Sequence, residues 1–100
     1  MEVTLALVGG KWKPLILYYL TQRMYRFGEL MRQLPNVTQR MLTRQLRELE
    51  ADGLVHREVY AQVPPRVEYS LTALGTSLEP LLSTMDAWGE TYLNHETAKR

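Results

Sequence analysis

The chain contains no cysteine and only two histidines among its 100 residues. Without cysteine, these residues can form no disulfide, no thiolate metal site and no thiol-based redox sensor. No apolar run approaches the ~20 residues that a membrane-spanning helix needs, and no segment resembles a signal peptide. We therefore expect a protein of the cytoplasm that binds no metal, no cofactor and no membrane.

Candidate catalytic groups are also scarce. His56 lies in a predicted strand and His95 near the end of the chain, and no nearby pair of acids suggests a metal site beside either. The three serines, Ser70, Ser77 and Ser83, belong to no motif that would activate a hydroxyl. The sequence therefore predicts that the protein is not an enzyme.

The charge of the chain is divided unevenly along its length. Residues 1–47 carry eight basic and two acidic side chains, a net charge of +6, whereas residues 48–100 carry four and nine, a net charge of −5. Such asymmetry is typical of a fold with one surface for nucleic acid, although it also arises by chance clustering. The length, near the usual size of a domain, predicts a single domain over residues 1–100.

One segment, residues 38–52, reads as a helix with two opposed faces. Leu42, Leu46 and Leu49 recur at helical spacing and are predicted to point into a core. Thr38 is a plausible N-cap for this helix, and Gly53 a plausible residue just beyond its C-terminus.

The opposite face of this helix is basic. Arg40, Arg44 and Arg47 fall there, with Thr43 beside them and no carboxylate among them. Guanidinium groups in this arrangement suit planar, anionic and hydrogen-bonding partners such as base edges and phosphates. The alternative is an ordinary solvated helix face.

The segments around this helix predict a helix-turn-helix followed by a β-hairpin. Residues 27–34 form a short amphipathic pattern, and a turn starting at Pro35 joins it to the basic helix. Residues 54–60 and 66–71 then alternate as strands do, and Pro64 and Pro65 make a stiff tip between them. The sequence thus predicts a mainly α fold with a small β-hairpin (α+β), in the order of a winged helix-turn-helix. Earlier helices are expected at residues 2–8 and 14–22.

The charge at the hairpin tip allows two interpretations. Arg66 stands where the chain leaves the tip, within reach of a DNA backbone or a minor groove. Alternatively, Arg66 pairs with Glu58 or Glu68 within the hairpin.

A last helix is predicted from Thr72 to about His95. Its apolar positions are spaced 4, 3, 4, 3 and 4 residues apart over ~28 Å, longer than one small core covers. A second copy of the chain would cover them, although the helix could also fold back over its own domain. Pro80, off this stripe, could kink the helix. The positions are Leu74, Leu78, Leu81, Met85, Trp88 and Tyr92.

Five segments in order resemble the HxlR-type subgroup of MarR-like bacterial transcription regulators, over about residues 3–90. The resemblance implies a homodimeric winged-helix protein that binds a roughly palindromic operator. Residues 38–52 would then be the recognition helix, residues 54–71 the wing with its tip at 61–66, and residues 72–95 the dimer helix. The segments are 9–12 (GGKW), 26–30 (RFGEL), 38–43 (TQRMLT), 46–55 (LRELEADGLV) and 63–72 (VPPRVEYSLT).

The resemblance also implies which residues form the dimer interface, and it has one departure. Members of the subgroup often carry a sensor cysteine before the first helix, which this sequence lacks, so thiol sensing is not carried over. An unknown small-molecule effector is possible instead, bound among methionines and aromatic residues that could equally be plain core. The expected interface residues are Leu5, Leu78, Leu81, Met85, Trp88 and Tyr92.

The expected DNA contacts follow from side-chain chemistry. Gln39, Arg40, Thr43 and Arg44 are candidates for base edges, because Arg suits guanine, Gln suits adenine and a Thr methyl meets thymine.

The remaining candidates are expected at the DNA backbone. Thr38 and Arg47 are candidates for phosphate, and Arg66 for the backbone or the minor groove. Arg26 and Lys11 are weaker phosphate candidates. The alternative function is a winged-helix module that binds a protein and no DNA.

Overall fold

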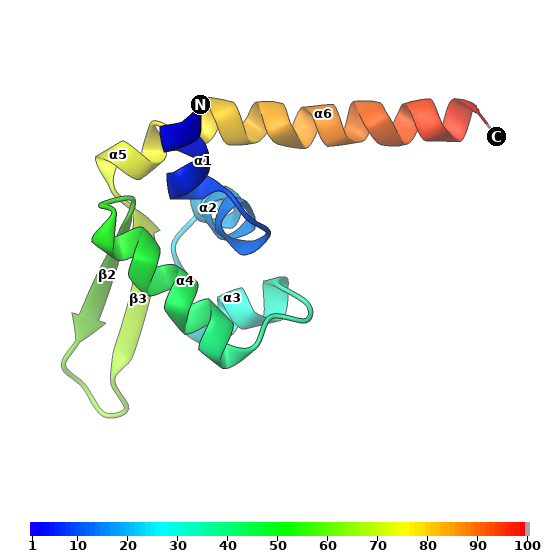
Figure 1. Cartoon of the computed structure of the whole chain (residues 1–100). Helices are drawn as coiled ribbons and strands as arrows, with labels where there is room; N and C mark the ends of the chain where they lie inside the picture. The colour runs from blue at the N-terminus through cyan, green and yellow to red at the C-terminus, as the bar shows by residue number, and fades with distance from the viewer. Residues whose placement is uncertain (100) are drawn as a thin grey trace.

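The structure, a computed structural model, describes residues 1–99, which form six helices and a small antiparallel sheet (Figure 1). This confirms the predicted fold class, mainly helical with a small β-hairpin. The elements in chain order are α1 (Glu2–Val8), α2 (Trp12–Gln22), β1 (Tyr25–Arg26), α3 (Phe27–Gln33), α4 (Gln39–Ala51), β2 (Val55–Tyr60), β3 (Arg66–Leu71), α5 (Ala73–Thr76) and α6 (Glu79–Ala98).

Helix α4 begins and ends where its local sequence signals predict. The Thr38 hydroxyl accepts a hydrogen bond of 3.1 Å from the backbone N–H of Met41, which satisfies one of the free donors of the first turn. Beyond the last turn Gly53 has φ of +77°, a left-handed conformation that glycine adopts without a steric penalty.

A single core holds α4 against the other elements. No polar or charged residue among residues 1–99 is buried with it, so the core is held by apolar packing alone. Figure 1 shows α4 lying across α3 and α2 on one side and beside the β2–β3 hairpin on the other. The buried residues are Val8, Trp12, Ile16, Leu17, Leu20, Tyr25, Leu30, Leu34, Val37, Leu42, Leu46, Leu49, Leu54, Val55, Tyr69 and Leu82.

The sheet has three strands rather than the two that the sequence predicts. The order is β1-β3-β2, and β1 pairs with β3 through Tyr25 opposite Tyr69 and Arg26 opposite Glu68. Strand β1 has only two residues, too few to show the alternation that marks a strand in a sequence. The pairing with β3 attaches the start of α3 to the hairpin, and the buried Tyr25 side chain packs in the core at this junction.

The predicted continuous helix from Thr72 to His95 is wrong, because the structure divides it into α5 and α6. The break precedes Pro80, which stands in the first turn of α6. Proline there removes a backbone donor, and inside a longer helix its ring would clash with the carbonyl of Thr76. Pro80 thus ends up at a helix start instead of kinking a helix, and α6 continues to Ala98.

Two residues fix where α5 sits. The Thr72 hydroxyl accepts a hydrogen bond from the Gly75 N–H at 3.0 Å and donates one to the Gly53 carbonyl at 2.6 Å. A Cβ at Gly75 would collide with the carbonyl oxygen of Leu54, so glycine allows this close approach. The start of the C-terminal region is therefore attached to the end of α4.

Helix α6 extends away from the rest of the molecule as a rod (Figure 1). Leu82 is its one buried residue among those described, and it joins the core that α2 also lines. Leu81, Met85, Trp88 and Tyr92 are 40–65% exposed. None of the helices in residues 1–99 has the length and hydropathy required to cross a membrane.

Candidate nucleic-acid interface

The outward face of α4 gathers the predicted base contacts. Arg40, Arg44 and Arg47, here called the arginine face, are exposed, and Gln39 and Thr43 lie beside them. Together with Glu48 these five side chains line an open depression of about 650 Å³. The buried leucines on the other side of the same helix hold this face outward.

One carboxylate does approach the arginine face. Glu48 lies 3.7 Å from Arg44 Nε through one oxygen and 3.2 Å from Lys13 Nζ through the other. The Arg44 side chain remains 78% exposed, so this contact leaves its guanidinium available to a ligand. Within residues 1–99, Arg40 and Arg47 have no carboxylate within 4.0 Å.

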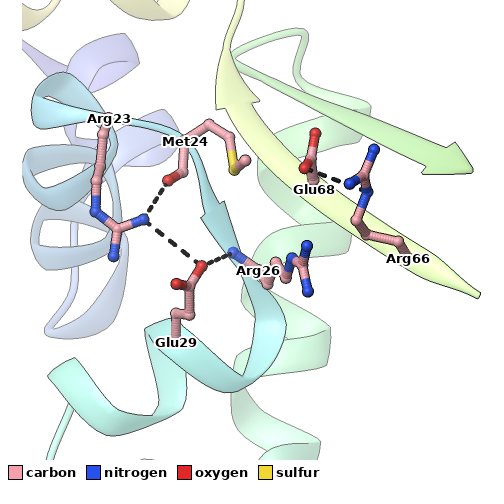
Figure 2. Close-up of polar contacts among 6 residues, drawn as sticks. All are labelled: Arg23, Met24, Arg26, Glu29, Arg66 and Glu68. Carbon is pink, nitrogen blue, oxygen red and sulfur yellow. Dashed lines mark hydrogen bonds and ion pairs between the residues drawn. The ribbon is translucent and has the colours of Figure 1, made fainter.

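Arg66 is held inside the hairpin, as the second interpretation of the sequence expects. Its Nε lies 3.5 Å from a Glu68 oxygen (Figure 2), and its guanidinium lies 4.1 Å from the centroid of the Tyr60 ring. The carboxylate of Glu68 also raises the pKa of Tyr60. The Arg66 side chain is one-third exposed, and its Nε is buried without a hydrogen bond. A DNA contact by Arg66 would compete with these neighbours and stays a prediction.

The start of α3 is fixed by a small polar cluster (Figure 2). The backbone N–H of Arg26 donates to the Glu29 carboxylate at 2.8 Å, and Arg23 lies 3.6 Å from the same oxygen. The backbone hydrogen bond from Arg26, assisted by the charge of Arg23, lowers the pKa of Glu29. In Figure 2 the Arg26 guanidinium points away from Glu29, which leaves it free for another partner.

The predicted weaker phosphate contacts lie apart from the arginine face. The Arg26 side chain lines a notch of about 320 Å³ with Pro64, Pro65 and Arg66 of the hairpin tip. Lys11 is exposed at the start of α2, with its ammonium 4.7 Å from the Trp12 ring. The notch brings Arg26 close to the wing, whereas Lys11 does not line it.

The structure adds an arginine that the sequence did not single out. Arg57 of β2 is exposed and lines a groove of about 420 Å³ together with Gln39, Thr43 and Arg47 of α4. The alternation of β2 could have indicated this position, because Arg57 is two residues after buried Val55 and so lies on the same face of the strand. Val55 of this face is buried in the core, whereas Arg57 is exposed and lines the groove.

A small pocket lies beside some of the residues at which the sequence places an effector. A pocket of about 190 Å³ between α2 and α6 is lined by Tyr18, Leu82 and Met85, among others. This volume is below the range of typical small-molecule sites. Trp12 lies in the core, and Trp88 and Tyr92 stack with ring centroids 5.8 Å apart on exposed α6. Tyr18 thus lines this pocket, whereas Trp12 belongs to the core and Trp88 and Tyr92 to the surface.

The architecture and the basic helix together define a winged helix-turn-helix protein. Helices α3 and α4 are the helix pair, and β2 and β3 with their proline-containing tip are the wing. The sequence model of the HxlR-like helix-turn-helix family matches residues 7–97. The chain belongs to this family, as its sequence motifs indicate.

Relatives and solved structures agree with this assignment. The uncharacterized HTH-type transcriptional regulators YdeP and YybR of Bacillus subtilis (strain 168) are 58% and 59% identical to the chain. They align over 92% and 90% of it and 72% of their own lengths. The structure of the redox regulator HypR in its reduced form superposes with a TM-score of 0.91 at 55% identity, covering 97% of this chain and 96% of HypR.

The function follows at the level of the family. The chain is an HxlR-type helix-turn-helix transcription regulator, and DNA binding is the property that this family implies. These findings do not favour the alternative of a protein-binding module without DNA binding.

Proposed function

We propose that the chain regulates transcription as a homodimer that binds a roughly palindromic operator, with α4 of each protomer in a major groove. The observation that carries this proposal is the arginine face, which is exposed on a helix fixed by buried leucines. The major groove of B-DNA is wide enough to admit an α-helix. Buried leucines fix the orientation of α4, so its arginine face can point toward base edges and phosphates.

Base recognition is assigned to the N-terminal half of α4. Gln39, Arg40, Thr43 and Arg44 lie there and line one depression. The Thr43 hydroxyl donates to the Gln39 carbonyl at 2.8 Å, which leaves the Thr43 methyl free to meet a thymine methyl. Arg44 keeps most of its surface exposed and suits the two acceptors of guanine.

Backbone contacts surround this reading surface. The N–H groups at the start of α4, beside Thr38, suit a phosphate because they are free donors at the positive end of the helix dipole. Arg47 lies one turn after Thr43 and Arg44, and it has no carboxylate within 4.0 Å among residues 1–99. We assign Arg47 to phosphate, and Arg66 to the wing tip near the minor groove.

Dimerisation is assigned to α6 and α1. Leu81, Met85, Trp88 and Tyr92, here called the apolar stripe, lie on a rod whose described residues leave them 40–65% exposed. Contiguous apolar surface of this kind marks interaction sites. Leu5 of α1 is 59% exposed and adds to this surface, whereas Leu78 is half-buried in its own protomer and contributes less.

Selection of bound sequences from random duplexes tests the proposal. The expected product is an inverted repeat whose half-sites are separated by about one helical turn, roughly 10 base pairs, because two symmetric recognition helices must reach successive major grooves. Enrichment of a single unrepeated half-site would contradict the dimer, and no enrichment even at low salt would contradict operator binding itself.

A further inference from the structure

The groove between α4 and the β-hairpin, here called the wing groove, has one wall from each element. Gln39, Thr43 and Arg47 form the α4 wall, and Arg57 stands on the hairpin wall. The apolar part of the lining, here called the apolar floor, consists of Phe27, Leu46, Val67 and Tyr69. The wing groove therefore combines a basic rim with an apolar base.

Arg57 is the single charged side chain that the hairpin places on this side. Strand alternation puts Val55, Arg57 and Val59 of β2 on one face with the facing residues of β3. The six residues of this face are Val55, Arg57, Val59, Val67, Tyr69 and Leu71. Arg57 is thus the one guanidinium on an otherwise apolar face, and its side chain is exposed.

The two arginines of the hairpin differ in their partners. Arg66 lies on the opposite face, 3.5 Å from Glu68 and stacked on Tyr60. Arg57 has no carboxylate within 4.0 Å among residues 1–99. Arg47 across the wing groove is equally unpaired, and Glu50 is the one acid of the lining, so the wing groove has a net positive charge.

We propose that the wing groove holds one sugar-phosphate strand of duplex DNA, with Arg57 and Arg47 binding its phosphates from opposite walls. The inference rests on the proposed function, because a helix in the major groove and a wing over the adjacent minor groove must straddle the strand that separates them. The apolar floor then faces the deoxyribose, and the rim faces the charge. Arg57 is thereby the principal backbone contact of the wing.

Binding to a mixed-sequence duplex tests this assignment first. Arg57→Ala should weaken binding roughly tenfold at 0.1 M salt and reduce the log–log salt slope by about 0.9, as expected for one lost phosphate contact. Arg57→Lys should keep the slope, because the charge remains. Glu50→Gln should strengthen binding, since it removes the one negative charge of the wing groove.

The control is Lys99→Ala, which removes one positive charge at the far end of α6 and should leave the slope unchanged. Equal affinity and slope for Arg57→Ala and the unchanged chain would overturn the proposal. So would a loss of thermal stability in Arg57→Ala without a change in slope, because Arg57 would then be a structural partner of Glu50. Failure of the unchanged chain to bind any duplex would instead overturn the proposed function.

The absence of cysteine from the sequence allows a direct positional test. An iron chelate that generates hydroxyl radicals can be attached at Arg57→Cys and, as the control, at His56→Cys on the outer face of the same strand. The duplex recovered by selection is the substrate. The Arg57→Cys conjugate should cut the strand between the bound major groove and the adjacent minor groove more strongly than the His56→Cys conjugate does. Equal cutting by the two conjugates would overturn the assignment.

Discussion

Helices α4 and α6 both carry apolar residues at helical spacing, which are buried in α4 and mostly exposed in α6. Leu42, Leu46 and Leu49 of α4 are at most 1% exposed, because α2, α3 and the sheet cover them. On α6 the apolar stripe begins beside buried Leu82, and its residues stay 40–65% exposed along the rod. Helical spacing thus predicts which side of a helix is apolar, whereas tertiary structure decides what covers it.

The comparison also separates two kinds of functional surface. In α4 the apolar side is structural and the polar side is available to a ligand, so the function is assigned to the arginine face. In α6 the apolar side itself is exposed, so the function is assigned to the apolar stripe. Substitutions on the two helices should accordingly affect different measurements.

The largest effect is expected from Leu46→Ala in α4. Leu46 is 1% exposed, and truncation of a buried leucine leaves a cavity that costs about 2–5 kcal/mol of unfolding free energy. Denaturant unfolding at fixed protein concentration measures this loss. Met41→Ala, on the same helix at a residue that is 38% exposed, is the control and should cost much less. Similar losses in both variants would contradict the assigned core.

The next effect is expected from Trp88→Ala in α6. A central interface tryptophan contributes about 2–4 kcal/mol to association, so the variant should dissociate at far higher protein concentration. Sedimentation equilibrium measures this change, and the fold of the protomer should survive because Trp88 is 65% exposed. Glu90→Ala, at an exposed position off the apolar stripe, should leave association unchanged. An unchanged dimer in Trp88→Ala would remove α6 from the interface.

Arg44→Ala should cost roughly 1–3 kcal/mol of operator binding if Arg44 reads a base. Fluorescence anisotropy on the selected operator and on a mixed-sequence duplex measures the difference. Lys99→Ala removes the same charge far from α4 and is the control. Equal weakening on both duplexes would reassign Arg44 to the backbone, and no weakening would remove it from the interface.

The smallest effect concerns pH and Glu29. The hydrogen bond from the Arg26 N–H lowers the pKa of Glu29 from its ordinary value of 4.5. The ionised carboxylate therefore stabilises the folded state above about pH 4.5, and this contribution disappears as the pH falls through the lowered pKa. Glu29→Gln should reduce the denaturant midpoint slightly at pH 7 and flatten its acid dependence. An acid dependence identical to that of the unchanged chain would contradict the role of Glu29.

Local signals account for what the sequence predicts well. The boundaries of α4 depend on a capping hydroxyl at Thr38 and a left-handed glycine at Gly53, both of which act within a few residues. The hairpin is likewise evident from alternation around a tip that contains prolines. These features need no knowledge of distant contacts, so the fold class follows from the chain alone.

Non-local contacts account for the rest. Strand β1 exists only because Tyr25 reaches Tyr69, and the position of α5 depends on the meeting of Gly75 with Leu54. The partner of Arg66 required the geometry of the finished hairpin. Arg57 could be placed on a face from the sequence, but the open groove beside it appears only once α4 lies against the sheet.

The salt dependence of DNA binding by the unchanged chain tests the central claim most directly. On the selected operator, the logarithm of the association constant should fall linearly with the logarithm of salt concentration, with a slope of about −0.9 for each phosphate neutralised. Simultaneous replacement of Arg40, Arg44 and Arg47 by alanine should make that slope shallower and abolish operator preference. Tight, salt-independent binding, or an unchanged slope after the triple replacement, would contradict the assignment of α4 to the DNA.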